Sequence, residues 1–570
     1  MTVETFLANF GHLADAPNGV RKLREMVLGL AVRGILTERE DTDTPVDSLL
    51  VQLNKSKSRL IQKKVVRDKD IRILAPILEE FDIPKDWKWV RVSQTCFLQT
   101  GATPSRQKPE NFGGDIRWLV SGDIHKGEIF DCEGRITEIG MASSNCKVLP
   151  EDSVMIALNG QGKTRATVAI LRVPAACNQS LVSITPFDKS QLLPEYVFWS
   201  LRYRYYEIRD VTGQKQRRGL NMQLVGELSI SLPPIEEQHR IVAKVDQLMA
   251  LCDDLEARQQ KQQEGRVRLN NAALDALLNA GDPADFASHW QRICANFDLL
   301  YDHPDTIAKL RAAILQLAVQ GKLVPQDPND EPAEVLLEKI KSEKERLVKA
   351  KVIKREDLLP VIASDFALYP IPASWSWNYF QDLTELVTDG EHSTPPRIPS
   401  AGIPMATAKN VRDGFIDLAA TDFVSEETAH KCWRRCRPVH DDILMVCVGA
   451  TTGRLAVIKN PPAFILVRSV ALIRPHSGFV VPEYLAIALR GPVGQNQIWG
   501  NVKQSAQPCL YIGKIKELNV PLPPLAEQQR IVAKVDQLMA LCDALEAKLN
   551  QARQQSEKLM EASVRQLLVG

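Results

Sequence analysis

The sequence predicts an α+β protein in which two mixed α/β domains are separated by two long antiparallel coiled-coil helices and related by a pseudo-twofold internal repeat. The same fourteen residues, RIVAKVDQLMALCD, occur at 240–253 and again at 530–543. Each copy follows a Pro-Pro step, at 233–234 and 523–524. The stretches before these steps carry short apolar and β-branched runs separated by Gly, Pro, Asn and Asp, which is typical of mixed domains. A repeat at about half the chain length indicates two copies of one structural unit.

Helical segments are expected in front of both mixed domains. Apolar residues at Leu23, Met26, Val27 and Leu30 follow the spacing of a helix, and Gly34 is a plausible stop. The pattern returns at 307–321. Basic stretches follow both copies, and a solvated helix face is favoured for them over a phosphate-binding face. These stretches are 55–67 and 339–354.

The repeat divides the chain into five regions. In order they are an N-terminal helical region (1–82), a first mixed domain (83–232), a central helical and coiled-coil region (233–368), a second mixed domain (369–522) and a C-terminal coiled-coil helix (523–570). Each mixed domain starts at an Ile-Pro-x-x-Trp-x-Trp motif and contains a Pro-Glu-Tyr triplet, which is expected to open a helix. Those helices should end near Arg202 and Arg490.

The repeated segment has the spacing of a coiled-coil seam, because its apolar residues recur in steps of four and three. The seam positions are Ile241, Val245, Leu248, Cys252 and Leu255 in the first copy, and Ile531, Val535, Leu538, Cys542 and Leu545 in the second. The first helix can continue to about Leu278, which gives about 45 residues or roughly 65 Å. Such a helix with one apolar stripe must pack along another helix, and its antiparallel duplicate is the expected partner.

Composition excludes several classes of protein. The net charge is +1, so any nucleic-acid site must be local. The eleven cysteines are scattered and lack zinc-ligand spacing, which favours reduced thiols and no metal site. No apolar run approaches the ~20 residues needed to span a bilayer. A cytoplasmic protein without a membrane segment is therefore expected.

Two motifs resemble catalytic sequences but are better explained as turns. The segment 160–164 resembles the end of a phosphate-binding loop, but position 157 is Ala and strand-like runs flank the segment, where that loop would lead into a helix. Its counterpart, 449–454, has the same setting, so both are predicted to be strand–turn–strand units. Asn460-Pro-Pro lacks the aromatic residue of the adenine methyltransferase motif and has no glycine-rich cofactor loop upstream. We therefore expect no catalytic residues.

The doubled order of segments resembles the specificity (S) subunit of type I restriction–modification enzymes. The matching residues are 232–242, LPPIEEQHRIV, and 522–532, LPPLAEQQRIV. The resemblance covers essentially the whole chain. It implies that the mixed domains are target recognition domains, each reading one half of a bipartite DNA site. It also implies that the repeated helices form an antiparallel coiled coil that sets the spacing between the half-sites.

The resemblance further implies the partners of the chain. These are double-stranded DNA, two modification (methyltransferase) subunits, which dock on the repeated helices, and restriction subunits. S-adenosylmethionine, ATP and magnesium are expected on the partner subunits, and no cofactor is expected on this chain, which would be a non-catalytic subunit. Identical helix segments fit two identical partners, and unlike domains fit two unlike half-sites. A protein-binding scaffold is the alternative, and a self-contained DNA methyltransferase or nuclease is less favoured.

Candidate DNA contacts are basic or amide side chains in turns of the two domains, because Arg and Lys bind phosphate or guanine and Gln binds adenine. They are Arg106, Lys108, Lys163, Arg165, Lys215, Arg217 and Arg218 in the first domain, and Arg397, Lys409, Arg454, Arg468, Lys503 and Gln504 in the second. A solvated or salt-bridged role is about equally expected for each.

Overall fold

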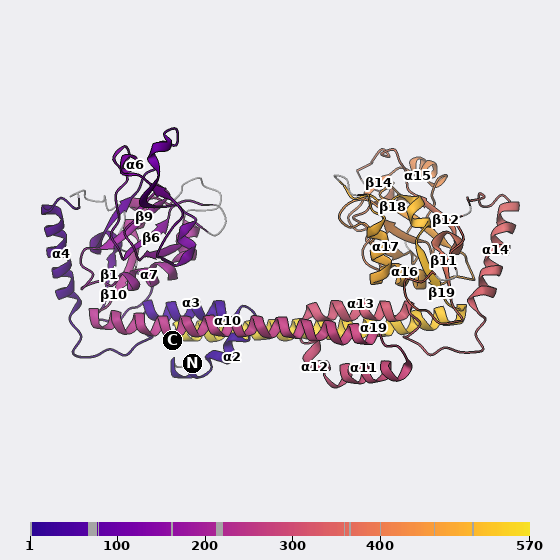
Figure 1. Cartoon of the computed structure of the whole chain (residues 1–570), viewed down its shortest axis with the longest axis horizontal. Coiled ribbons are helices and arrows are strands. Elements are labelled where there is room, and N and C mark those ends of the chain that lie inside the picture. Colours follow the sequence, from indigo (N-terminus) through magenta and orange to yellow (C-terminus); the bar gives the residue numbers. More distant parts are fainter. Residues whose placement is uncertain are drawn as a thin grey trace. The chain divides into compact units, whose positions relative to one another are not determined.

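The chain divides into two units of related architecture. In this computed structural model the described residues are 3–66, 77, 79–160, 164–211, 220–357, 359–363, 366–399, 401–460, 462–503 and 507–569. Unit 1 comprises Met1–Gln262 and Ala552–Gly570, and unit 2 comprises Gln263–Gln551. Each unit contains three helices that precede its mixed domain, at 3–32 in unit 1 and 283–319 in unit 2, which we call the base helices. Each also contains a basic helix rich in Lys and Arg, a mixed domain and parts of two long helices (Figure 1). The predicted internal repeat is therefore confirmed at the level of secondary structure.

The helices of unit 1 lie before its mixed domain in the sequence, within it and after it. They are α1 (Val3–Ala8), α2 (Phe10–Ala14), α3 (Gly19–Val32), α4 (Val46–Gln62), α5 (Val92–Thr95), α6 (Glu138–Ala142), α7 (Pro194–Tyr203), α8 (Tyr205–Val211), α9 (Met222–Glu227) and α10 (Ile235–Leu278), with single 3-10 turns η1 (Pro109–Asn111) and η2 (Asp123–Lys126). Helix α3 runs beside the first part of α10 (Figure 1), and the Arg24 guanidinium contacts Asp253 and Glu256 at 2.6 and 2.8 Å. The last part of α19 (Leu525–Val569) also belongs to unit 1.

The strands of the first mixed domain form three sheets. The strands are β1 (Lys88–Arg91), β2 (Cys96–Thr100), β3 (Phe112–Leu119), β4 (Glu128–Ile129), β5 (Arg135–Ile136), β6 (Ser153–Ala157), β7 (Val168–Leu171), β8 (Ala176–Cys177), β9 (Leu181–Pro186) and β10 (Ser229–Leu232). The sheet orders are β2-β9-β6-β7-β4, β5-β3-β8 and β1-β10. Strands β3 and β8 pair in parallel, whereas β6 and β7 form the predicted antiparallel strand–turn–strand unit.

Unit 2 repeats this plan with fewer strands. Its strands are β11 (Ser376–Tyr379), β12 (Thr384–Asp389), β13 (Ile403–Ala406), β14 (Asp422–Val424), β15 (Ile443–Val446), β16 (Leu455–Val457), β17 (Ile465–Leu466), β18 (Val470–Pro475) and β19 (Asn519–Leu522). The sheet orders, β12-β18-β15-β16, β14-β13-β17 and β11-β19, correspond to those of unit 1 without β4. The parallel pair is β13 and β17, and the second predicted strand–turn–strand unit is β15 and β16.

The helices of unit 2 also have counterparts in unit 1. They are α11 (Pro283–Ala295), α12 (Phe297–Leu300), α13 (Pro304–Val319), α14 (Ala333–Lys349), α15 (Glu426–Trp433), α16 (Pro482–Arg490), α17 (Pro492–Gly500) and α18 (Ile512–Lys516), with the 3-10 turn η3 (Phe380–Leu383). Helix α13 corresponds to α3, and the Arg311 guanidinium contacts Asp543 and Glu546 of α19 at 2.5 and 2.7 Å. The Pro-Glu-Tyr triplets open α7 and α16, as predicted.

The larger sheet of each mixed domain is buried on both faces. Along β6, Val154 and Ile156 join the core that includes α3, α7 and α10, whereas Met155 and Ala157 join a separate core on the other face. Side chains alternate between the faces of a strand, so a run that is apolar at every position can fill two cores. Along β15, Leu444 and Val446 in one core alternate with Ile443 and Met445 in the other.

A glycine just after the last base helix of each unit, α3 or α13, packs against the start of the mixed domain. Gly34 has φ +67°, and a Cβ there would lie 2.6 Å from the Pro84 ring and 2.9 Å from Trp87. Gly321 repeats this with φ +69° and a contact of 2.4 Å to Pro372. Only glycine accepts both the left-handed conformation and the close approach. The Ile-Pro-x-x-Trp motif therefore marks a packing junction between helix and domain.

The long helices begin as predicted, immediately after the Pro-Pro steps, and α10 ends at Leu278. Of the predicted seam positions, Ile241, Val245, Leu248 and Cys252 are buried in the core of unit 1, and Leu255 packs on its margin. Ile531, Val535 and Cys542 are buried in the core of unit 2, with Leu538 and Leu545 on its margin. The seam therefore packs in the core of its own unit with the base helices and the mixed domain, which the heptad spacing did not identify. The same cores include buried residues from the end of the other long helix, Met560 in unit 1 and Leu274 and Leu277 in unit 2.

Within the described ranges, no helix combines the length and apolarity needed to cross a membrane. The same part of the chain contains no group of three or more His, Cys, Asp or Glu residues arranged to hold a metal ion.

Candidate nucleic-acid interface

Each mixed domain and the helical segment before it are fixed to the start of a long helix by hydrogen bonds. In unit 1 the Trp87 Nε1 donates to Glu237 Oε2 at 2.8 Å, and both side chains are buried. Burial raises the pKa of Glu237, and the Trp87 hydrogen bond offsets part of that rise. The Gln238 Oε1 accepts from the Leu193 N–H at 2.9 Å, immediately before α7. The Arg240 guanidinium forms two hydrogen bonds with Asp43, at 2.9 and 2.6 Å.

Unit 2 repeats these contacts with the corresponding residues. Trp375 Nε1 donates to Glu527 Oε2 at 2.8 Å, and Gln528 Oε1 accepts from the Val481 N–H at 2.8 Å. The Arg530 guanidinium contacts Asp330 at 2.5 Å. The Glu-Gln pair just before each repeat thus holds the mixed domain on its helix in the same way in both units, and the first Arg of each repeat holds the segment that precedes the basic helix. This role explains part of the sequence identity between the two copies.

Three strand ends converge at one edge of the first mixed domain. They are the residues after β2 (101–106), after β3 (120–123) and after β8 (178–179). The Ala102 N–H donates to Cys177 O at 3.1 Å, and the Asn178 N–H donates to Leu119 O at 3.0 Å. A Cβ on Gly101 would lie 1.6 Å from Cys177 O, so glycine is required for this approach. We refer to these three segments as the first strand-end edge.

The second mixed domain forms the corresponding edge from the residues after β12 (390–397), β13 (407–410) and β17 (467–468). The Glu391 N–H donates to Leu466 O at 2.8 Å, and the Arg468 N–H donates to Glu391 O at 3.0 Å. A Cβ on Gly390 would lie 2.3 Å from Leu466 C, so this glycine is the counterpart of Gly101. We refer to these segments as the second strand-end edge.

Five of the predicted contact residues lie on or directly beside these edges. Arg106 belongs to the first edge and Lys108 lies two residues beyond it, while Arg397, Lys409 and Arg468 belong to the second. All five side chains are exposed. Arg397 pairs with Asp422 at 2.9 Å, a contact between two exposed groups that contributes little to stability. The other four form no ion pair with any described residue, so they are available to a negatively charged ligand.

The remaining predicted contacts lie elsewhere or outside the described residues. Arg165 lies between β6 and β7, where its backbone carbonyl accepts from Arg209, and Arg454 follows the turn between β15 and β16 and lies 3.8 Å from Asp413. Lys503 follows α17 and pairs through its backbone with Cys509. The residues outside the described ranges are Lys163, Lys215, Arg217, Arg218 and Gln504.

Several polar residues at the edges were absent from the sequence-based candidates. In the first edge, Thr103 Oγ1 donates to Gln179 Oε1 at 2.6 Å. Beside the second edge, the Arg435 guanidinium contacts Asp389 Oδ1 at 2.6 Å, and His392 lies 2.8 Å from the same carboxylate. Burial would raise the pKa of Asp389, but the hydrogen bonds from Arg435 and His392 outweigh it and lower that pKa. In the sequence the members of the Thr103–Gln179 and Arg435–Asp389 pairs lie far apart, and only the fold brings each pair together.

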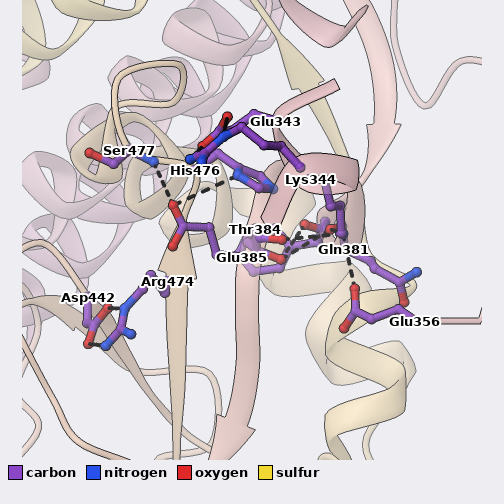
Figure 2. Close-up of polar contacts among 12 residues, drawn as sticks. Glu343, Lys344, Glu356, Gln381, Thr384, Glu385, Asp442, Arg474, His476 and Ser477 are labelled. Carbon is purple, nitrogen blue, oxygen red and sulfur yellow. Dashed lines mark hydrogen bonds and ion pairs between the residues drawn. The ribbon is translucent and has the colours of Figure 1, made fainter. Parts of the chain in front are cut away.

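A second polar cluster lies where α14 meets the second mixed domain (Figure 2). His476 is fully buried, and its ring nitrogens have no hydrogen-bond partner within the described structure. Its Nδ1 lies 3.9 Å from Glu385 Oε1, and Lys344 of α14 contacts Glu356 at 3.1 Å. Burial and, secondarily, the positive charge of Lys344 lower the pKa of His476 to about 4. At the corresponding place in unit 1 the buried residue is Phe187, whose ring lies 5.6 Å from the Lys57 ammonium in a cation–π contact.

Comparison with known proteins places this architecture in a family. The family model for the type I restriction modification DNA specificity domain matches residues 84–264 and 403–553, together more than half of the chain. The chain is similar to the type I restriction enzyme EcoEI specificity subunit of Escherichia coli, with 25% identity over 95% of this chain and 93% of that protein. The EcoAI specificity subunit of Escherichia coli is 26% identical over the same shares.

Among solved structures, the HsdS subunit from Thermoanaerobacter tengcongensis matches with a TM-score of 0.42 and 18% identity, over 85% of this chain and 99% of that chain. A chain from a type I R-M system structure matches with a TM-score of 0.47 and 18% identity, over 86% and 99%. The matched family regions fall on both mixed domains and their long helices, and the chain belongs to the type I restriction modification DNA specificity domain family.

Proposed function

We propose that this chain is the DNA sequence-specificity subunit of a type I restriction–modification complex, in which each mixed domain reads one half of a bipartite target. The observation that carries this proposal is the pair of strand-end edges. They have the same backbone contacts, centred on Gly101 and Gly390, but they present unlike side chains. Two domains with the same backbone contacts but different side chains are suited to recognise two different base sequences. The edges also carry exposed cations, which a polyanionic ligand requires.

The long helices would set the distance between the two half-sites. Each unit contains the first part of one long helix and the last part of the other, since unit 1 includes residues 552–570 and unit 2 includes residues 263–278. This composition supports the proposed antiparallel coiled coil. A single chain would then present two recognition domains with the pseudo-twofold relation that dimeric DNA readers obtain from symmetry.

The exposed side of the repeated segment is the proposed docking surface for two modification subunits. Ala243, Gln247, Ala250 and Leu251 are exposed, and so are their counterparts in the second copy. Leu251 is 40% exposed and Leu541 is 61% exposed. In unit 1, Thr37, Glu40 and Arg240 join Ala243 and Gln247 around a surface hollow. Two identical surfaces suit two copies of one partner.

Catalysis would belong to the partners of this chain. In this proposal the modification subunits hold S-adenosylmethionine, whereas ATP and magnesium act with the restriction subunits. The assembled complex works on DNA in the cytoplasm. The present chain contributes target choice and geometry. A protein-binding scaffold without DNA recognition is the alternative.

The test is to express the chain with its modification subunit and to sequence the methylated adenines of the host genome. We expect methylation at a gapped, two-part motif that disappears when the gene for this chain is deleted. The mass of the purified complex should correspond to two modification subunits per chain. A methylation pattern that does not depend on this chain would overturn the proposal. A complex that forms but shows no salt-sensitive DNA binding would favour the scaffold instead.

A further inference from the structure

Gln179 and Arg468 occupy corresponding places in the two mixed domains. Gln179 follows β8 and Arg468 follows β17, and each of these strands is the parallel partner in the smaller three-stranded sheet. Both side chains are exposed. In both domains the same segment carries a backbone hydrogen bond to the strand β3 or β13, through Asn178 or Val467 respectively. The strand before each residue and the backbone bond of the residue just before it thus correspond in the two domains, whereas the side-chain chemistry differs.

From this correspondence we infer that Gln179 and Arg468 are specificity-determining residues that read one base each, Gln179 an adenine and Arg468 a guanine. The inference rests on the proposed DNA-recognition function. A carboxamide pairs with the N6 and N7 of adenine, and a guanidinium pairs with the O6 and N7 of guanine, in both cases through two hydrogen bonds. The two domains would use one shared position to recognise different bases.

The surroundings of Gln179 leave the required atoms free. Thr103 Oγ1 donates to Gln179 Oε1 at 2.6 Å, which occupies one lone pair of that oxygen and fixes the direction of the amide. The second lone pair remains available to an adenine N6–H. The Gln179 Nε2 has no partner among the described residues and can donate to adenine N7. Thr103 is therefore a positioning residue for Gln179.

The surroundings of Arg468 keep its guanidinium free as well. Its backbone N–H is bound to Glu391 O at 3.0 Å, while its side chain forms no ion pair within the described structure. The nearby Glu391 carboxylate accepts two hydrogen bonds at its Oε1, from the Ser393 N–H at 3.1 Å and the Ser393 hydroxyl at 2.9 Å. Arg435 is held by Asp389 at 2.6 Å. Among these neighbours, Arg468 thus keeps donors that can reach a base edge.

The experiment exchanges the two side chains in the full-length chain, assembled with its modification subunit. Gln179→Arg should change the preferred base at one position of one half-site from adenine to guanine, and Arg468→Gln should make the opposite change in the other half-site. Methylated motifs and binding to oligonucleotide duplexes that differ at that base pair are measured. We expect a change in discrimination on the order of tenfold to a hundredfold, as for one bidentate pair. Gln179→Ala should lose discrimination at that position alone.

Controls separate base reading from charge effects and from positioning. Gln52→Arg and Arg355→Gln make the same charge changes at exposed positions outside the mixed domains and should leave the motif unchanged. Thr103→Val should weaken discrimination at the Gln179 position without a matching loss of total affinity, and Thr103→Ser should restore it. A uniform loss of affinity for all sequences would overturn the inference and assign a phosphate contact. An unchanged motif in both exchange variants would also overturn it, whereas a wild-type complex without any bipartite motif would overturn the proposed function itself.

Discussion

At the residue scale, the paired Trp–Glu contacts determine how firmly each mixed domain is held. We predict that Trp87→Phe lowers the free energy of unfolding of unit 1 by about 1–3 kcal/mol, because it leaves the buried Glu237 carboxylate without this donor. Chemical denaturation of the full-length chain measures this change. Trp290→Phe is the matched control, because Trp290 is 42% exposed and should change stability by less than about 0.5 kcal/mol. Equal effects of the two substitutions would contradict the structural role of the Trp87–Glu237 pair.

His476 provides a second test at this scale, through pH. Its pKa in the folded chain is lowered to about 4 from the usual 6.5, so neutral His476 favours the folded state. That stability is present above pH 6.5 and is lost as the pH falls toward 4, by at most about 1.4 kcal/mol per pH unit. We predict that His476→Phe removes this acid sensitivity from unit 2. Unfolding midpoints measured at pH 7 and pH 5 test the prediction.

The reciprocal substitution in unit 1 sharpens that test. Phe187 is 7% exposed and contacts Lys57, so Phe187→His places an ionisable ring in the corresponding junction. It should make unit 1 less stable at pH 5 than at pH 7. An acid profile that neither substitution changes would show that other groups control the response of the chain to acid.

At the element scale, the repeated helix segment has a buried side and an exposed side. Leu248 is 5% exposed in the core of unit 1, whereas Leu251, three residues further along the same helix, is 40% exposed. We predict that Leu248→Asp lowers the stability of unit 1 by about 3 kcal/mol or more, because a charge would be buried among apolar side chains. Thermal unfolding measures this loss.

The matched substitution Leu251→Asp should leave that stability nearly unchanged and instead weaken assembly with the modification subunit. Size-exclusion chromatography of the co-expressed proteins measures the assembly. Leu541→Asp should act in the same way on the second surface, so the double substitution should abolish binding of both partners. Full assembly of the double variant would place the docking surface elsewhere on the chain.

At the scale of the whole molecule, the two mixed domains should act as independent readers. We predict that replacing residues 83–232 with the corresponding block of another family member changes one half of the methylated motif and leaves the other half and the spacing unchanged. The physical reason is that the core of each mixed domain lies within one unit. Methylation sequencing of the host provides the measurement. A change in both halves, or in the spacing, would mean that the domains do not recognise DNA separately.

The sequence by itself determined the elements and their duplication. The heptad steps from Ile241 to Cys252 predicted a buried helix stripe, and the short apolar runs before the Pro-Pro steps predicted mixed domains with strands, which include β6 and β15. The ends of α7, α10 and α16 lie within a residue of the predicted positions. These features are local, because helix and strand periodicity depend only on neighbours a few residues apart.

Only the tertiary structure decided which side chains meet. Thr103 and Gln179 contact each other although 76 positions separate them, and Trp87 reaches Glu237 across 150 positions. The heptad spacing likewise identified the buried stripe but not the base helices that pack with it. Hydrogen bonds and packing between distant segments leave no periodic signal in one sequence, because they depend on how the chain folds back on itself. The edge proposed to read DNA therefore follows from the fold, whereas the duplication that holds two such edges was already evident from the sequence.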